Sequence, residues 1–85
     1  MYRIFTANKK VEKRLQRYIN LRKDIKNKLE RLKINPQEEI GTHKLHGRLA
    51  GKWSAWMGSN IRIIYSIDNL NKKIIIEAVG SHKIY

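Results

Sequence analysis

Three strand-like runs between Lys52 and His82 constrain the fold of this chain more than any other feature of its sequence. The first two, Lys52 to Met57 and Ile61 to Ile67, flank Gly58-Ser59-Asn60, which is typical of a tight hairpin turn. The third, Lys73 to Val79, is short and almost continuously apolar, as a central strand of a sheet would be. A small, mostly antiparallel sheet is therefore the expected centre of the fold.

The hairpin sorts its side chains onto two faces if the connecting loop is three residues long. One side would be apolar and comprise Trp53, Ala55, Met57, Ile61, Ile63 and Tyr65. The other side would comprise Lys52, Ser54, Trp56, Arg62, Ile64 and Ser66. A two-residue loop without a bulge would pair odd with even positions and mix the two sets, so we expect the longer loop.

A strand and a helical segment precede this hairpin. Tyr2 to Thr6 alternates between two sides and is rich in strand-favouring residues, so it is expected to form the first strand. From about Asn8 the period changes, and an apolar stripe at spacings of three and four extends to Ile34. Pro36 then ends the helical pattern.

The periodicity alone leaves open whether this segment is one helix or two. The stripe stays in phase through Arg22, which favours a single helix of about 27 residues, roughly 40 Å long. A chain of 85 residues has no core long enough to cover such a helix. Asn20 is also a residue type that caps helices. We therefore expect an antiparallel helical pair broken between Asn20 and Lys23.

These elements predict one α+β domain over residues 1–85, in the order strand, helix, helix and three strands (β-α-α-β-β-β). The helical pair would pack on one face of a mostly antiparallel four-stranded sheet. The opposite face would carry Trp56 and Arg62. Gln37 to Gly51 would connect the helices to the sheet as a loop, because it follows a proline and contains three glycines.

The charge balance is strongly basic, since 19 Lys and Arg against 7 Asp and Glu give a formal net charge of +12. Such a field attracts polyanions, so nucleic acid, an anionic membrane surface or an acidic protein would each satisfy it. Nucleic acid fits best, because membrane binding requires a helix with bulky apolar residues opposite its basic face. With no cysteine, no run of about 18 apolar residues and no secretion signal, we expect a soluble, cytoplasmic protein without a membrane partner.

The expected loop gathers basic residues that are candidates for a contact surface, because loops carry function more often than packed elements do. They are His43, Lys44, His46, Arg48 and Lys52. The loop is not a phosphate-binding P-loop, since Trp53 follows Gly51-Lys52 where Ser or Thr is needed. A metal site built from the histidines is disfavoured, because no cysteine and no clear carboxylate ligand accompanies them, and we expect no metal or cofactor.

Three short motifs stand out along the chain. They are Gly47-x-x-x-Gly51-x-Trp53, the strand Asn60-Ile61-Arg62-Ile63-Ile64-Tyr65, and the ending Val79-Gly80-Ser81-His82 with a terminal aromatic residue. Together with the order of elements, they resemble the RelE/ParE superfamily of toxins from bacterial and archaeal toxin–antitoxin pairs. The resemblance covers essentially the whole chain, and the ending is most similar to the YafQ-like branch of ribosome-dependent messenger RNA endonucleases (mRNA interferases).

This resemblance implies a metal-independent endoribonuclease in which the 2′-hydroxyl next to the scissile phosphate is the nucleophile. The reaction needs a base, an acid and fixed positive charge around the phosphorane. His82 matches the family's C-terminal catalytic histidine, Arg62 its strand arginine that clamps the phosphate, and His43 its loop histidine. Tyr85 resembles the terminal aromatic residue that stacks on or orients the RNA, and His46 lies where relatives often differ.

The chain departs from its relatives on the strand before the arginine. Ser54 and Trp56 stand where RelE proper carries lysines, and Trp56 and Asn60 stand where the YafQ branch carries a histidine and an aspartate. The acid–base set is therefore thinner than in either relative, and Trp56 can instead stack on a base. The residues expected to bind RNA are Lys44, Arg48, Lys52, Trp56 and Asn60.

The partners implied by the resemblance are a cognate acidic antitoxin, messenger RNA and the ribosome. A toxin–antitoxin hetero-oligomer would bind its own operator DNA through the antitoxin. Two other functions are open, namely a ParE-like inhibitor of DNA gyrase without nuclease activity and a non-toxic basic RNA-binding domain. The pairing of His82 with Arg62 favours the nuclease, because a protein that only binds has no chemical need for both.

Overall fold

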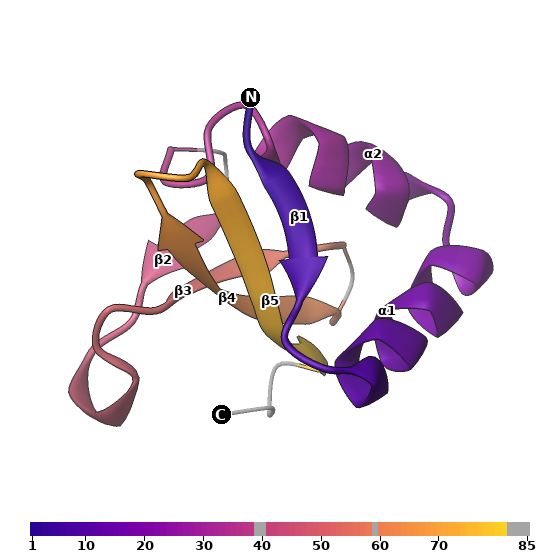
Figure 1. Cartoon of the computed structure of the whole chain (residues 1–85). Helices are drawn as coiled ribbons and strands as arrows, with labels where there is room; N and C mark the ends of the chain where they lie inside the picture. Colours follow the sequence, from indigo (N-terminus) through magenta and orange to yellow (C-terminus); the bar gives the residue numbers. More distant parts are fainter. Residues whose placement is uncertain (39–40, 59, 82–85) are drawn as a thin grey trace.

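Two helices and a five-stranded sheet make up the fold in a computed structural model that describes residues 1–38, 41–58 and 60–81. The elements are β1 (Arg3–Thr6), α1 (Lys9–Leu21), α2 (Asp24–Leu32), β2 (Thr42–Lys44), a short 3₁₀ helix η1 (Gly47–Leu49), β3 (Trp53–Trp56), β4 (Arg62–Asp68) and β5 (Lys73–Gly80). Figure 1 shows both helices on the same side of the sheet. The predicted α+β class is confirmed, and the order of elements differs from the predicted one by β2 and η1, which lie between α2 and β3.

The strands lie in the order β1-β5-β4-β3-β2, with β1 parallel to β5 and every other pair antiparallel. The apolar run from Lys73 therefore forms a central strand, as predicted. The prediction of four strands is wrong, because β2 lies inside the segment expected to be a loop. This polar strand of three residues carries no strand signal of its own and forms by pairing with β3, where His43 lies opposite Ser54.

The hairpin between β3 and β4 has the register that the sorting of its side chains predicts. Trp53 pairs with Tyr65 and Ala55 pairs with Ile63, while the Met57 backbone N–H donates to the Ile61 carbonyl at 2.8 Å. The apolar side of the hairpin consequently faces the helices. The other side faces away from them, as expected for Trp56 and Arg62.

The helical segment is broken into two helices at the predicted place, after Leu21. The first helix begins at Asn8, whose Oδ1 accepts from the Val11 backbone N–H at 2.9 Å, and Arg22 leaves the helix in an extended conformation. Asn20 is not a cap, because it lies inside α1 and its Oδ1 accepts from Gln16 one turn earlier at 3.1 Å. None of the described helices is long and apolar enough to cross a membrane.

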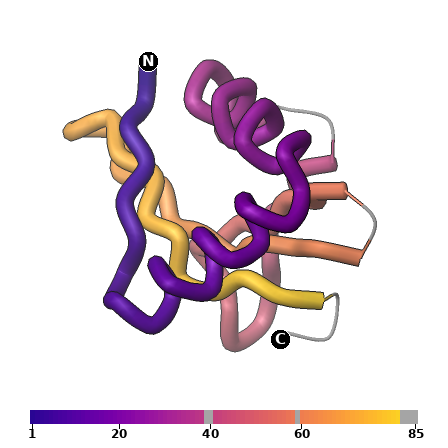
Figure 2. Tube along the Cα trace, turned by 90° about the vertical axis from the view of Figure 1, so that its right-hand side faces the viewer, coloured from indigo at the N-terminus to yellow at the C-terminus, as the bar shows by residue number. Residues whose placement is uncertain are grey.

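The helices also differ from an antiparallel pair, since Figures 1 and 2 show them meeting at an open angle. Both helices contribute buried apolar side chains to the core that they share with the sheet. The buried core between the helices and the sheet comprises Leu15, Ile25, Leu29, Leu32, Ala55, Met57, Ile63, Tyr65, Ile74, Ile76 and Val79.

Tyr65 joins the core to the segment that follows α2. Its side chain is fully buried and its hydroxyl donates to the Pro36 carbonyl at 2.5 Å. Burial raises the pKa of the Tyr65 hydroxyl well above its ordinary value, so the group remains a hydrogen-bond donor at any physiological pH. This bond fixes the start of the connection that leads to β2.

A bulge in β5 decides which side chains share a face near its end. Ile76 pairs with Tyr65, but Ala78 pairs with Ile64, the residue just before Tyr65 on β4. Glu77 is therefore the extra residue of the bulge. The shift lets Ile76 and Val79 both enter the core although they are three positions apart. It also leaves Glu77 on the side of the sheet away from the helices.

Candidate functional site

The sheet face turned away from the helices, called the helix-free face below, gathers most of the candidate residues. Its members from the central strands are Lys52, Ser54, Trp56, Arg62, Ile64, Ser66, Glu77 and Ala78. His43 joins them at the edge, since it pairs with Ser54 and directly paired residues of antiparallel strands share a face. The register thus brings together four residues predicted from the sequence, namely His43, Lys52, Trp56 and Arg62.

Arg62 and Trp56 form a stacked pair on this face. They lie opposite each other on β4 and β3, and the Arg62 guanidinium carbon is 4.2 Å from the centroid of the Trp56 ring. The Trp56 backbone N–H donates to the Gly41 carbonyl at 3.3 Å, and a Cβ at Gly41 would lie 3.6 Å from the Trp56 Cβ. Trp56 is therefore held from both sides, and it fixes a planar group of donors suited to a phosphate.

His43 lies on β2, two strands away from Arg62, so the strand axes are about 10 Å apart. Its side chain is exposed and available for proton transfer. On the neighbouring strand, its partner Ser54 is fully buried, and the Ser54 hydroxyl oxygen has no hydrogen-bond partner within the described ranges. The row from His43 over Ser54 to Ile64 crosses the middle of the helix-free face.

Lys52 and Glu77 form an ion pair across the same face. The Lys52 Nζ lies 2.6 Å from the Glu77 carboxylate, and the two side chains are 34% and 30% exposed. Sequence reasoning selected Lys52 but missed Glu77. A signal was present, because Glu77 is the only acidic residue in an otherwise apolar strand.

Three of the other predicted residues lie on exposed surface around the hairpin and the connection before it. Lys44 is opposite Trp53 and therefore belongs to the other side of the sheet from His43. His46 and Arg48 lie in the connection around η1, and both are exposed. The structure does not bring these three residues together with Arg62.

Asn60, His82 and Tyr85 complete the predicted site. Asn60 is exposed in the turn between β3 and β4. His82 and Tyr85 lie outside the described residues, so their placement stays a prediction. Residues 1–38, 41–58 and 60–81 contain no group of three or more His, Cys, Asp and Glu side chains that could hold a metal ion.

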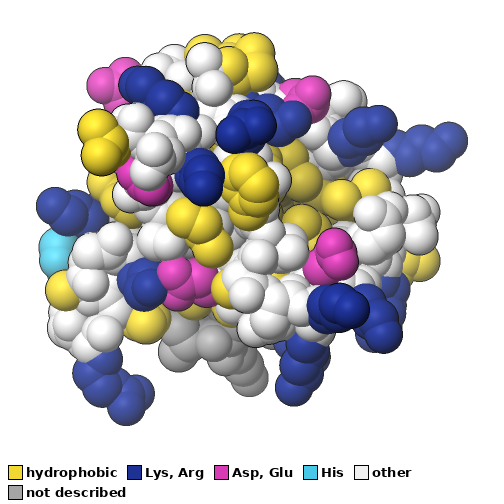
Figure 3. Space-filling view, in the orientation of Figure 1, with side chains coloured by type: hydrophobic (Ala, Val, Ile, Leu, Met, Phe, Trp, Pro, Cys, Tyr) yellow, Lys and Arg dark blue, Asp and Glu magenta, His cyan; other side chains and the backbone are white. Residues whose placement is uncertain are grey.

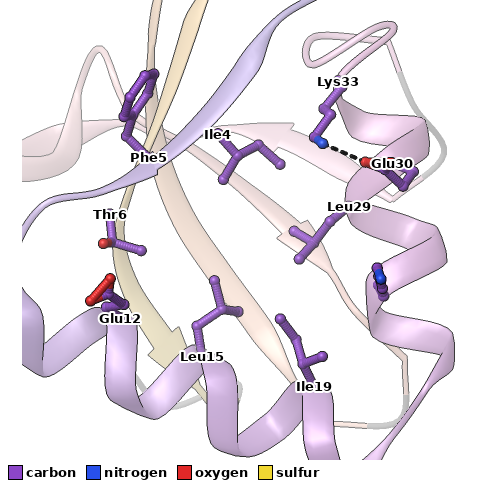
Figure 4. Close-up of a pocket in the computed structure, with 10 residues that line it drawn as sticks. Ile4, Phe5, Thr6, Glu12, Leu15, Ile19, Leu29, Glu30 and Lys33 are labelled. Carbon is purple, nitrogen blue, oxygen red and sulfur yellow. Dashed lines mark ion pairs between the residues drawn. The ribbon is translucent and has the colours of Figure 1, made fainter.

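A second feature is an apolar groove between β1 and the two helices, with a volume of about 470 Å³. Figure 4 shows the side chains of Ile4, Leu15, Ile19 and Leu29 pointing into the space that these elements enclose. In the space-filling view the same region is a hydrophobic patch bordered by charged side chains (Figure 3). We call it the β1 groove.

The β1 groove runs along an edge of the sheet. The strand β1 lies at one end of the strand order. Its backbone N–H groups at Arg3 and Ala7 donate to the carbonyls of Lys72 and Ile76 on the β5 side. No other described strand pairs with the opposite edge of β1. An apolar groove beside such an edge can accept an extended peptide.

Comparison with known proteins gives no match to a family model and none to a curated protein sequence. Solved structures do match over nearly the whole chain. YoeB in the YoeB–YefM complex from Staphylococcus aureus is 24% identical, with 96% of this chain and 98% of that chain covered and a TM-score of 0.70. YafQ from E. coli is 21% identical, with coverage of 96% and 94% and a TM-score of 0.63.

A metal-bound toxin from Helicobacter pylori is 20% identical, with full coverage of both chains and a TM-score of 0.76. Likeness at these identities establishes the fold. The chain therefore has the fold of RelE/YoeB/ParE-type toxins, and the resemblance seen in the sequence is confirmed at that level.

Proposed function

We propose that this protein is the toxin of a toxin–antitoxin pair and that it is an endoribonuclease that cleaves messenger RNA. The observation that carries the proposal is the helix-free face, where a guanidinium fixed by stacking (Arg62) shares a surface with an exposed histidine (His43). The solved structures with this fold include YoeB and YafQ. The formal net charge of +12 supports a polyanionic substrate.

In the proposed reaction the 2′-hydroxyl attacks the adjacent phosphorus and the bond to the 5′-oxygen breaks. The products are a 2′,3′-cyclic phosphate and a free 5′-hydroxyl. One histidine takes the proton from the 2′-hydroxyl and another donates a proton to the departing 5′-oxygen, and His43 and His82 fill these roles. Histidine side chains make both transfers, so the proposed mechanism requires no metal.

Arg62 stabilises the negative charge that develops on the phosphorane. Its planar fork of N–H donors matches two phosphate oxygens, and stacking on Trp56 keeps the fork oriented before the RNA arrives. Tyr85 would stack on or orient the RNA near the cut. Next to the cut, the flanking RNA would contact Lys52 on the helix-free face and Asn60 in the β3–β4 turn. The exposed residues Lys44, His46 and Arg48 could bind only RNA farther from the cut, because they do not lie beside Arg62.

The β1 groove is the proposed docking site of the antitoxin, which is known by name for one neighbour, YefM in complex with YoeB. An acidic antitoxin segment would add a strand to the open edge of β1 and insert apolar side chains between Ile4 and Leu29. The basic surface supplies charge complementarity for this segment. The antitoxin would also link the complex to its operator DNA.

The second candidate function is inhibition of DNA gyrase in the manner of ParE. Ser54 and Trp56 favour it, because they stand where related nucleases carry ionisable side chains, and Ser54 is fully buried. A YoeB/ParE toxin from Agrobacterium tumefaciens shares the fold, with 17% identity and a TM-score of 0.72. This candidate leaves the stacked Arg62 and the exposed His43 without a chemical role.

The test is to map RNA 5′ ends after induction of the wild-type protein and of His82→Ala. We expect new 5′-hydroxyl ends confined to translated codons, as for cleavage in the ribosomal A site, and none with the variant. His82→Ala should also abolish growth arrest while keeping its fold and its binding to the antitoxin. Undiminished toxicity of His82→Ala without RNA cuts would favour the gyrase inhibitor.

A further inference from the structure

The Lys52–Glu77 ion pair crosses over β4 on the helix-free face. Lys52 precedes β3 and Glu77 lies on β5, so the pair bridges over β4. The bulge in β5 makes this contact available, because it places Glu77 as an extra residue on this face. The N–O distance of 2.6 Å shows direct contact, and about a third of each side chain still reaches solvent.

The position of the pair places it beside the proposed path of the RNA. Lys52 and Trp56 are four residues apart on one face, which is about 13 Å along the strand. Because Arg62 stacks on Trp56, a phosphate next to the one held by Arg62 can reach the Lys52 ammonium group. A carboxylate at the same place repels that phosphate and also neutralises the lysine.

Partly exposed ion pairs are weak and can exchange partners with other charged groups. A phosphate with its oxygen acceptors is a strong competitor for a lysine. We propose that Glu77 is a competitor built into the RNA-binding face, which holds Lys52 in the free protein and is displaced by an RNA phosphate flanking the scissile one. This inference rests on the proposed function and adds Glu77 to the residues that set the affinity for RNA.

The test measures binding of a fluorescent single-stranded oligoribonucleotide by anisotropy. The probe carries 2′-O-methyl groups, so it lacks the nucleophile and reports binding without cleavage. We expect Glu77→Gln to bind it three- to tenfold more tightly than the wild type. The reason is that the contact between Lys52 and the phosphate then forms without displacing a carboxylate. Lys52→Gln should bind the probe more weakly.

The matched control is Glu30→Gln, which removes the carboxylate of the Glu30–Lys33 ion pair on α2. It changes the net charge by the same amount as Glu77→Gln, so the two variants differ in the location and the exposure of the removed carboxylate. We expect its affinity for the probe to stay within twofold of the wild type. If Glu77→Gln does not fold, as judged by circular dichroism, Glu77→Ala replaces it with the same expected tightening.

The outcomes separate this inference from the proposed function. Equal affinities of Glu77→Gln and Glu30→Gln, in a wild type that binds the probe, overturn the role of Glu77 alone. Weaker binding by Glu77→Gln does the same, because it shows that Glu77 only positions Lys52. A wild type that does not bind the probe overturns both the inference and the RNA-directed function.

Discussion

The Arg62 guanidinium lies over the Trp56 ring, 4.2 Å from its centroid, and the two residues are directly paired across β3 and β4. The family resemblance implies an ionisable group at this position, and the contact gives a physical reason for a tryptophan there instead. An aromatic ring cannot transfer a proton, but it can hold a guanidinium in one orientation. Trp56 is thus a positioning residue for the proposed phosphate clamp.

Substitution of Trp56 should therefore slow RNA cleavage by disordering Arg62. A partly exposed cation–π contact is worth about 0.5 to 2 kcal/mol, so Trp56→Ala should lose roughly 3- to 30-fold in rate. Trp56→Phe keeps a ring and should recover most of that loss. The measurement is cleavage of a defined messenger RNA in a cell-free translation system. An alanine variant as fast as the wild type would show that the stacking is dispensable.

Removal of the Tyr65 hydroxyl should destabilise the fold, because it leaves the buried Pro36 carbonyl without its donor. Loss of a partner for a buried polar group costs about 1 to 3 kcal/mol in the free energy of unfolding. Urea denaturation of Tyr65→Phe measures this. The control is Tyr2→Phe, whose hydroxyl bonds to Asn69 in an exposed position and should cost less than about 1 kcal/mol. Similar losses in both variants would contradict the role of the buried bond.

Gly58 and Gly51 allow backbone strain to be separated from steric crowding. Both have positive φ, +96° and +90°, so alanine is strained at either position. A Cβ at Gly58 would also lie 2.8 Å from the Arg22 guanidinium, whereas a Cβ at Gly51 would meet nothing within 4 Å. We expect Gly58→Ala to lower the unfolding free energy by less than about 1 kcal/mol more than Gly51→Ala, because the crowding atoms are the ends of flexible, partly exposed side chains.

The comparison of Gly58→Ala with Gly51→Ala is made by thermal and urea denaturation. The difference arises because the Arg22–Asp24 ion pair, with an N–O distance of 3.0 Å, must move away from the turn. Equal destabilisation of the two variants would show that the pair adapts at no cost. In that case the junction between the helices is not anchored on the β3–β4 turn.

A charge in the β1 groove should weaken binding of the antitoxin. Ile19→Glu introduces a carboxylate among the apolar side chains of the groove, and we expect the affinity to fall more than tenfold. Leu21→Glu is the matched control on the same helix, since Leu21 is 73% exposed and does not line the groove. Calorimetric titration with the proposed antitoxin measures both. Equal affinities would exclude the groove as the docking site.

The two faces of the hairpin could be predicted because side chains alternate with a period of two. In the observed register Trp53 lies on the apolar face with Tyr65, and Trp56 lies on the opposite face with Arg62. The helix break could be predicted from the size of the core. The strand β2 could not, because its residues Thr42–Lys44 are polar and form a strand only by pairing with β3. The prediction that Asn20 caps a helix was wrong, because its side chain accepts a hydrogen bond from Gln16 inside α1.

The site was predicted in part, and the limits have a clear physical origin. Arg62 and His43 share a face because register propagates from strand to strand. The single acidic side chain in β5 could have drawn attention to Glu77, but the bulge that sets its face depends on pairing with β4 and could not be predicted. The Arg62–Trp56 stacking depends on rotamers, which alternation cannot specify.

The parallel pairing of β1 with β5 has a consequence for how the protein is made. Arg3 pairs with Lys73, so β1 can pair with its neighbour only after β5, about 70 residues later in the chain, has been synthesised. Contacts between such distant parts of a chain form slowly, and a domain completes its fold as a unit. A nascent chain that lacks β5 has no strand to pair with Arg62 on β4. It also has no strand to hold β1 beside the helices, where the β1 groove forms. The proposed RNA cleavage and the proposed antitoxin binding should thus both require that β5 has been synthesised.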